Sequence, residues 1–390
     1  MGSFSHLTID SHPMFYIKNW YFSELVDLIF LPEDYKEEVR KFRYLNKIYK
    51  VKAYDNEDDT YIFKGFRQTA KVCKSRLSIY GYTLKKAQKD FQQAKKIARV
   101  EGDYDFPIGK VNYQQYLSAI KAILRNELDH SDYILQSLCK SFEGGDWAIY
   151  GQSIAGILYS ILSILPDDSI IELDLTDVID GGHLSKEQAK LISYEKILIL
   201  TEGKTDKDFI SSAMMKLYPY LVAYYHFIDF EEYKVESNAS ALVKLVTSFA
   251  ASNIKHPIIV LFDNDTTGIM EMNKLKSVNL GSNFKILKFP DLKIAKKYPT
   301  VGPTGKKKMN INGLACGIEL YLGKGILTKG TELIPIQWKA YNEKEKKYQG
   351  EIQEKNYVQE KFREKIKFNL STDLDDLDMI MKEIFDAFRN

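Results

Sequence analysis

The chain has 390 residues, of which 45% are hydrophobic and 13% aromatic, so it is expected to form two or three folded domains and is not a disordered chain. Its net charge is only +2, which leaves local clusters of charge as the only electrostatic argument for nucleic-acid binding. The three cysteines are far apart and have no metal-site spacing, so reduced thiols are expected. No signal pattern and no apolar run long enough to span a bilayer occurs, which predicts a cytoplasmic protein without a membrane partner.

The first half of the chain mixes strand and helix patterns. Apolar and polar residues alternate over residues 4–18 on both sides of a Ser-His-Pro turn, which predicts a β-hairpin. Residues 20–50 are charged and have a helical pattern, and further helices are expected over residues 69–100, 113–140 and 153–165. Alternation over residues 170–177 predicts a strand. We therefore expect an α+β domain over residues 1–190.

The second half repeats a strand, a turn with acids, and a helix. Ile197 to Leu200 form an apolar run followed by Glu202-Gly203, and Ile258 to Phe262 form another followed by Asp263-Asn264-Asp265. Carboxylates at i and i+2 on a strand end point to the same side and can share one divalent cation. Further strands over residues 220–230 and 284–289 complete four parallel strands alternating with helices. This predicts an α/β domain over residues 191–327.

Residues 328–390 are expected to form an extension that packs on the α/β domain. The pattern around Trp338 indicates irregular structure, and helices are expected over residues 352–367 and near the C-terminus.

The Glu-Gly turn and the Asp-x-Asp turn together resemble the Toprim domain, which topoisomerases, primases and OLD-family nucleases share. The resemblance implies a Rossmann-like sheet of four parallel strands and magnesium or manganese, with two ions. It implies catalytic roles for Glu202, Asp206 and Lys355, and metal ligation by Glu202, Asp206, Asp263, Asp265 and Glu319. Each of three residues also has an ordinary alternative. Asp206 could be a helix-capping acid, Glu319 a solvated acid, and Lys355 a surface lysine.

Lysines are concentrated after the fourth predicted strand. Residues 285–308 contain eight lysines and one acid, which predicts a track for phosphate groups, unless the segment is simply a solvated loop. The lysines expected to bind nucleic acid are Lys204, Lys288, Lys306, Lys307 and Lys308.

The N-terminal half carries a competing candidate. Its first ten residues and Leu173–Asp177 resemble the domain found at the N-terminus of HEPN- or Toprim-containing proteins of bacterial conflict systems. Arg125 and His130 fit the Arg-x4-His motif of HEPN ribonucleases, which cleave RNA without metal. Positions five apart on a helix diverge by about 140°, so this pair would meet only near a helix end or across a dimer.

These patterns favour a divalent-metal-dependent endonuclease that acts in bacterial anti-phage defence. The alternatives are a HEPN-type ribonuclease that uses Arg125 and His130, and a non-catalytic subunit that binds nucleic acid. No Gly-x4-Gly-Lys-Ser/Thr motif occurs, so any ATP requirement would be met by a partner ATPase or another defence protein. The sequence leaves the choice between DNA, tRNA and other RNA open, and also a homo-oligomeric state.

Overall fold

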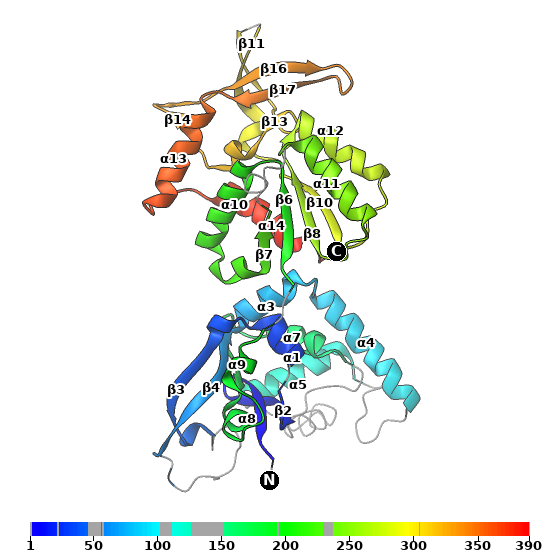
Figure 1. Ribbon diagram of the computed structural model, residues 1–390, viewed down its shortest axis with the longest axis vertical. Coiled ribbons are helices and arrows are strands. Elements are labelled where there is room, and N and C mark those ends of the chain that lie inside the picture. Colours follow the sequence, from blue (N-terminus) through cyan, green and yellow to red (C-terminus); the bar gives the residue numbers. More distant parts are fainter. Residues whose placement is uncertain are drawn as a thin grey trace. The chain divides into compact units, whose positions relative to one another are not determined.

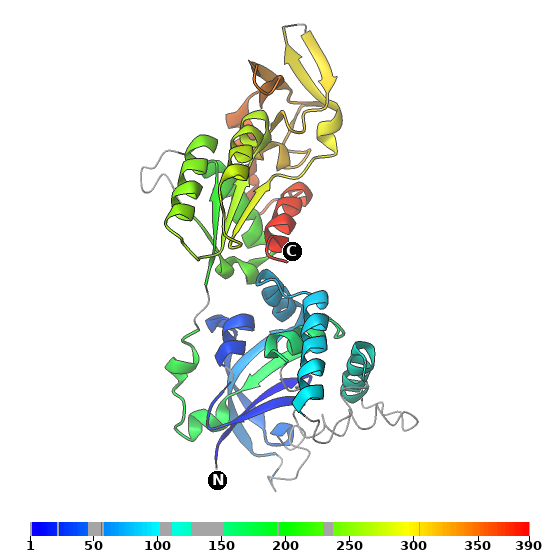
Figure 2. The ribbon, with the colours of Figure 1, turned by 90° about the vertical axis from the view of Figure 1, so that its right-hand side faces the viewer.

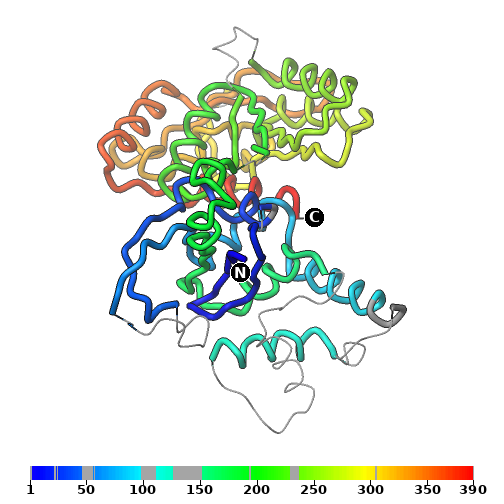
Figure 3. Tube along the Cα trace, turned by 60° about the horizontal axis from the view of Figure 1, so that its bottom comes forward, coloured from blue at the N-terminus to red at the C-terminus, as the bar shows by residue number. Residues whose placement is uncertain are grey.

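The computed structural model of the chain forms two compact units, Met1–Tyr194 and Glu195–Phe388 (Figure 1). It describes residues 2–21, 23–45, 56, 58–101, 111–125, 152–192, 195–228, 237–303 and 305–389. Figure 3 follows the chain through unit 1, in blue to green, before it enters unit 2, in green to red. Each unit has its own sheet and is described by itself.

Unit 1 contains a five-stranded antiparallel sheet with the order β2-β1-β5-β4-β3. The hairpin predicted over residues 4–18 is confirmed as the first two strands. The strands are β1 (Phe4–Ile9), β2 (His12–Lys18), β3 (Tyr35–Lys41), β4 (Thr60–Thr69) and β5 (Ile170–Asp174). The helical prediction for residues 20–50 is wrong at β3, because this charged segment pairs along its whole length with β4.

One face of this sheet packs against helices. Leu7, Ile9, Phe66, Ile171 and Leu173 point into one core with residues from the helices, as strand alternation requires. The helices predicted over residues 69–100 and 153–165 are confirmed. The helices of unit 1 are α1 (Ser23–Ile29), α3 (Ala70–Ile79), α4 (Leu84–Glu101), α5 (Tyr113–Arg125), α7 (Ile154–Leu162), α8 (Thr176–Asp180) and α9 (Lys186–Ala189), with a 3-10 turn at Pro32–Asp34.

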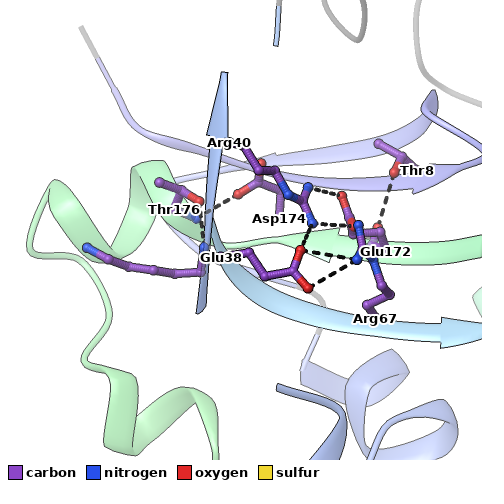
Figure 4. Close-up of polar contacts among 8 residues, drawn as sticks. Thr8, Glu38, Arg40, Arg67, Glu172, Asp174 and Thr176 are labelled. Atoms are coloured by element: carbon purple, nitrogen blue, oxygen red, sulfur yellow. Dashed lines mark hydrogen bonds and ion pairs between the residues drawn. The ribbon is translucent and has the colours of Figure 1, made fainter. Parts of the chain in front are cut away.

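The opposite face of the same sheet carries charged side chains (Figure 4). Arg40 donates to both oxygens of Glu172, at 2.7 and 2.9 Å, and Arg67 bridges Glu172 to Glu38. These contacts satisfy the half-buried charges of neighbouring strands, and a hollow of about 500 Å³ lies over them. Burial raises the pKa of the adjacent Asp174 to about 6, although hydrogen bonding from Thr176 opposes the shift.

Unit 2 is built on a parallel sheet with the order β10-β8-β6-β7, which confirms the expected four parallel strands. The first and third strands along the chain are therefore direct neighbours. The strands are β6 (Ile197–Thr201), β7 (Tyr225–Phe227), β8 (Ile258–Phe262) and β10 (Phe284–Lys288). β8 is buried along its whole length, as its continuous apolar run predicts.

Helices cover both faces of the parallel sheet (Figure 1). Apolar residues of α11 and of the segment that follows α12 pack against β6, β8 and β10 in one core. On the other side lie α10 and α14, which contact each other. The helices of unit 2 are α10 (Lys204–Leu217), α11 (Ala239–Ala251), α12 (Thr266–Lys274), α13 (Lys355–Lys367) and α14 (Asp375–Asp386), with 3-10 turns at Pro219–Tyr224, Leu275–Ser277, Ile294–Lys297 and η6 (Ile318–Tyr321).

A second sheet of unit 2, with the order β12-β11-β16-β17, lies beyond the parallel sheet, and its β11–β12 hairpin projects outward (Figure 2). Its strands are β11 (Tyr298–Gly302), β12 (Gly305–Met309), β16 (Ile336–Asn342) and β17 (Lys347–Ile352). The expectation of irregular structure around Trp338 is wrong, because Trp338 lies within β16. Shorter strand pairs join β9 (Asn264–Asp265) to β13 (Ala315–Cys316) and Thr328–Lys329 to Glu332–Leu333. Among the described helices of the chain, none is both long and apolar enough to cross a membrane.

Candidate active site

The carboxyl ends of β6 and β8 bring two acids together. Because these parallel strands are neighbours, the residues that follow them, Glu202 and Asp263, emerge at the same edge of the sheet. The Asp263 backbone N–H donates to Glu202 Oε1 at 2.8 Å. Glu202 therefore ties the two strand ends together while its carboxylate stays at the edge.

Two glycines allow the acids to approach this closely. A Cβ atom at Gly268, in the first turn of α12, would lie 2.6 Å from the Asp263 carbonyl oxygen and 2.7 Å from Glu202 Oε1. A Cβ atom at Gly317 would lie 3.3 Å from Asp263 Oδ2 and 3.3 Å from Glu319 Oε2. The space that a side chain would fill at each glycine is thus bordered by carboxylate oxygens.

Asp263 and Asp265 have different surroundings although they are two residues apart. Asp265 caps α12, since its Oδ1 accepts from the Gly268 N–H at 2.7 Å, and its Oδ2 accepts from Gln349 Nε2 at 2.6 Å. Asp263 is partly exposed, but its Oδ1 atom is buried and has no hydrogen-bond partner within the described residues. Burying a carboxylate oxygen without a hydrogen-bond donor lowers the stability of the fold unless a ligand binds that oxygen.

Asp206 and Glu319 are two further acids of the cluster, and both are buried. Asp206 lies in the first turn of α10 and accepts from the Gly203 N–H at 3.0 Å, so the capping role is real. Glu319, on η6, is only 3% exposed, which rules out the solvated alternative. Glu319 Oε1 accepts from Gln359 Nε2 at 2.7 Å and lies 3.4 Å from Lys355 Nζ.

Lys355 is the cation placed among these acids. It begins α13, and its ammonium group lies 3.4 Å from Glu319 and 3.4 Å from Glu351. Burial acts to lower the pKa of Lys355, but the two glutamates outweigh it and the pKa is raised. Lys355 therefore stays charged, and although its side chain is 43% exposed it is paired with two glutamates.

Burial raises the pKa of the acids in this cluster. The pKa of Glu202 rises to about 8, chiefly through burial, with the charges of Asp265, Asp206 and Glu271 adding to the shift. The pKa of Asp206 rises to about 7 through burial and the charge of Glu319. The pKa of Asp263 is raised well above its ordinary value by burial and by the charges of Asp206 and Glu202. Without metal, the acids of the cluster therefore retain protons at a pH where exposed carboxyl groups are ionised.

The donor set fits magnesium or manganese in its chemistry. All the acids offer oxygen, which these ions prefer, and Asp263 Oδ1 has no hydrogen-bond partner. The positions fit less closely, because within the part of the chain that is described no three His, Cys, Asp or Glu side chains are already arranged around one point. Glu202, Asp206 and Asp265 each accept from a backbone N–H group, which occupies one acceptor position of each carboxylate and leaves others for a metal.

The family of the chain is decided by its first half. A family model described as HEPN/Toprim N-terminal domain 1 matches residues 1–195, which is half of the chain. The chain belongs to the HEPN/Toprim N-terminal domain family. No curated protein and no solved structure matches it. Membership indicates a nuclease-related protein of a defence system, and the match ends just before β6, so it does not include the carboxylate cluster.

The structure describes only one of the two residues of the Arg-x4-His motif in the first half of the chain. Arg125 is the last residue of α5, and His130 lies outside the residues that the structure describes. The two alternatives for this pair therefore stay open.

The predicted phosphate-binding lysines lie in three different settings. Lys204 is exposed at the start of α10. Lys288 is tied to Asn264 and Asp291, at 3.3 and 3.1 Å, beside the carboxylate edge. Lys306, Lys307 and Lys308 are exposed on the edge strand β12.

Three residues of the site were missed by sequence reasoning. Gln349 and Gln359 hold Asp265 and Glu319 from residues 84 and 40 positions away along the chain. Glu271 is buried on α12, one turn after Gly268, and its charge contributes to the raised pKa of Glu202. Glu271 is three residues after Gly268, so helical spacing could have predicted that it lies on the same side of α12. No local sequence pattern predicts the positions of the two glutamines.

Proposed function

We propose that the carboxylate cluster of unit 2 hydrolyses phosphodiester bonds of nucleic acid with the help of divalent metal. The observation that carries the proposal is the buried Oδ1 of Asp263, which has no hydrogen-bond partner among the described residues, on an acid that stands between Glu202 and Glu319. The family membership supports a nuclease-related role. Asp263, Asp206 and Glu319 would hold the metal, with Asp265 and Glu202 completing the set.

When bound, a divalent ion activates water and stabilises the charge that develops on a phosphoryl group. The residues of the chain supply the remainder. Glu202, whose pKa is raised to about 8, can hold or release a proton near neutral pH. Lys355 places a positive charge next to Glu319, and Gln349 orients Asp265 without adding charge.

The decisive variant is Asp263→Asn, which removes one negative charge and keeps the shape of the side chain. We expect it to abolish Mg²⁺- or Mn²⁺-dependent cleavage of plasmid and total RNA, and EDTA to do the same to the wild type. The melting temperature should stay near the wild-type value or rise, because clustered acids repel one another without metal. The matched control is Glu332→Gln, an exposed acid on the short strand Glu332–Leu333, which should cleave normally. Full cleavage by Asp263→Asn would refute the proposal.

A further inference from the structure

Three aromatic rings gather on the β16–β17 hairpin of unit 2. The rings of Tyr341 and Tyr348 lie 5.0 Å apart, and those of Trp338 and Tyr348 lie 5.7 Å apart. Tyr341 is 51% exposed and Tyr348 48% exposed, so the two tyrosines present ring surface to solvent. Large exposed aromatic groups next to a candidate active site require an explanation.

The backbone places these rings on one face. Trp338 and Tyr341 are three residues apart, and regular strand alternation would put them on opposite faces. The pairing register shifts between Trp338 and Ala340, and this bulge returns Tyr341 to the face of Trp338. A Cβ atom at Gly350 would lie 2.8 Å from the indole ring, so this glycine lets the indole lie against backbone.

The same hairpin is attached to the carboxylate cluster. The hydroxyl of Thr266 donates to the Tyr348 carbonyl at 2.7 Å. Gln349, the next residue, donates to Asp265 and accepts from the Thr267 N–H at 3.0 Å. Tyr348 and Gln349 are adjacent in β17, so their side chains point to opposite faces of the hairpin, and the hairpin backbone joins the aromatic face to the contact that orients a predicted metal ligand.

Positive charge borders the aromatic face. Lys307 pairs with Thr300, and Thr300 pairs in turn with Ile336, two residues before Trp338. Cross-strand partners point to the same side of a sheet, so Lys307 shares the side of Trp338. At the tip of the β16–β17 hairpin three exposed lysines, Lys344, Lys346 and Lys347, alternate with Glu343 and Glu345, so three positive and two negative charges leave a net charge of +1 there.

We propose that this hairpin binds unpaired nucleotides, whose bases stack on Tyr341 and Tyr348 while their phosphates meet the neighbouring lysines. Rings beside cations are the combination by which proteins hold single-stranded nucleic acid without reading its sequence. A continuous duplex keeps its bases stacked on one another and offers none to the tyrosines. The inference rests on the proposed nuclease function and narrows its substrate to nucleic acid with single-stranded segments.

The test measures binding and not cleavage, so that it is independent of catalysis. Fluorescence anisotropy in EDTA compares the full chain with Tyr341→Leu/Tyr348→Leu, and with Tyr341→Phe/Tyr348→Phe as the matched control that keeps the rings. The ligands are a single-stranded oligonucleotide, its abasic counterpart with the same phosphates, and the duplex. DNA and RNA versions of each show whether the sugar matters.

The leucine variant should bind the base-bearing single strand about tenfold more weakly, and the phenylalanine variant should bind it like the wild type. All three proteins should bind the abasic strand equally. The triple variant Lys306→Gln/Lys307→Gln/Lys308→Gln should weaken the binding of the base-bearing and the abasic strand alike. It should also reduce the slope of log affinity against log salt concentration by up to about two units.

Two outcomes would overturn the inference. One is that the leucine variant binds the base-bearing strand as tightly as the wild type does, which would mean that the rings only stabilise the hairpin. The other is that the wild type has no preference for the base-bearing strand over the abasic strand and the duplex, a comparison that holds even if the leucine variant does not fold. Base-dependent binding without any metal-dependent cleavage would instead refute only the proposed nuclease activity.

Discussion

Glu202 and Asp206 hold protons at a pH where these side chains are ordinarily ionised. In the folded chain burial raises the pKa of Glu202 to about 8 and that of Asp206 to about 7, from ordinary values of 4.5 and 3.8. Between these limits the folded state binds more protons than the unfolded state, so the free energy of unfolding falls as the pH rises. Stability from these two groups is complete below about pH 4 and is lost above about pH 8.

We therefore expect the metal-free protein to lose up to about 6 kcal/mol of stability between about pH 5 and about pH 8.5, if both groups titrate independently. Thermal melting followed by circular dichroism measures this loss, and Mg²⁺ should restore more stability at the higher pH because it binds the ionised acids. Glu202→Gln, which cannot titrate, is the control and should show a smaller slope. Equal slopes in both proteins would mean that Glu202 is ionised throughout.

Among the elements, α12 shows how closely a helix is fitted to the site. Its Gly268 faces the Asp263 carbonyl and Glu202, and an added Cβ would lie within 2.7 Å of both. Alanine is the better helix former by about 1 kcal/mol, but the collision opposes that gain. The position of α12 relative to β8 is therefore set by a glycine.

Gly268→Ala should lower the free energy of unfolding by about 1–3 kcal/mol, the usual cost of overpacking, and should also weaken Mn²⁺ binding. Chemical denaturation and calorimetric titration measure the two effects. The matched control is Gly325→Ala, because no atom lies within 4 Å of the added Cβ and the backbone there is not left-handed. A Gly268→Ala protein as stable as the control would show that α12 moves without cost.

The chain forms two compact units, and each unit contains one candidate active site. The HEPN/Toprim N-terminal domain contains Arg125 and His130, and unit 2 contains the carboxylate cluster. The two candidates differ in their need for metal, so paired substitutions separate them.

Glu202→Gln should lower turnover by at least about a hundredfold, the scale for losing a general acid or base. The substitution keeps an oxygen that can accept from the Asp263 N–H, so the strand ends should stay joined. His130→Ala should leave turnover within about tenfold of wild type. Cleavage assays on RNA and DNA with Mg²⁺ or EDTA measure both variants. EDTA-resistant RNA cleavage that disappears with His130→Ala and survives Glu202→Gln would move the active site to the N-terminal domain.

The sequence pattern by itself predicts those helices and strands whose burial depends on residues close to them along the chain. The β1–β2 hairpin, the buried α7 and the four parallel strands of unit 2 follow from apolar spacing, and parallel strand geometry then predicts that Glu202 and Asp263 meet. Tertiary structure alone decided the rest. Strand β3 was predicted as helix because the pairing that makes it a strand comes from a distant segment, and its Arg40 is paired with Glu172 across 132 residues. Gln349, Gln359 and the bulge that gathers the aromatic face depend likewise on pairing between distant segments, which no local periodicity records.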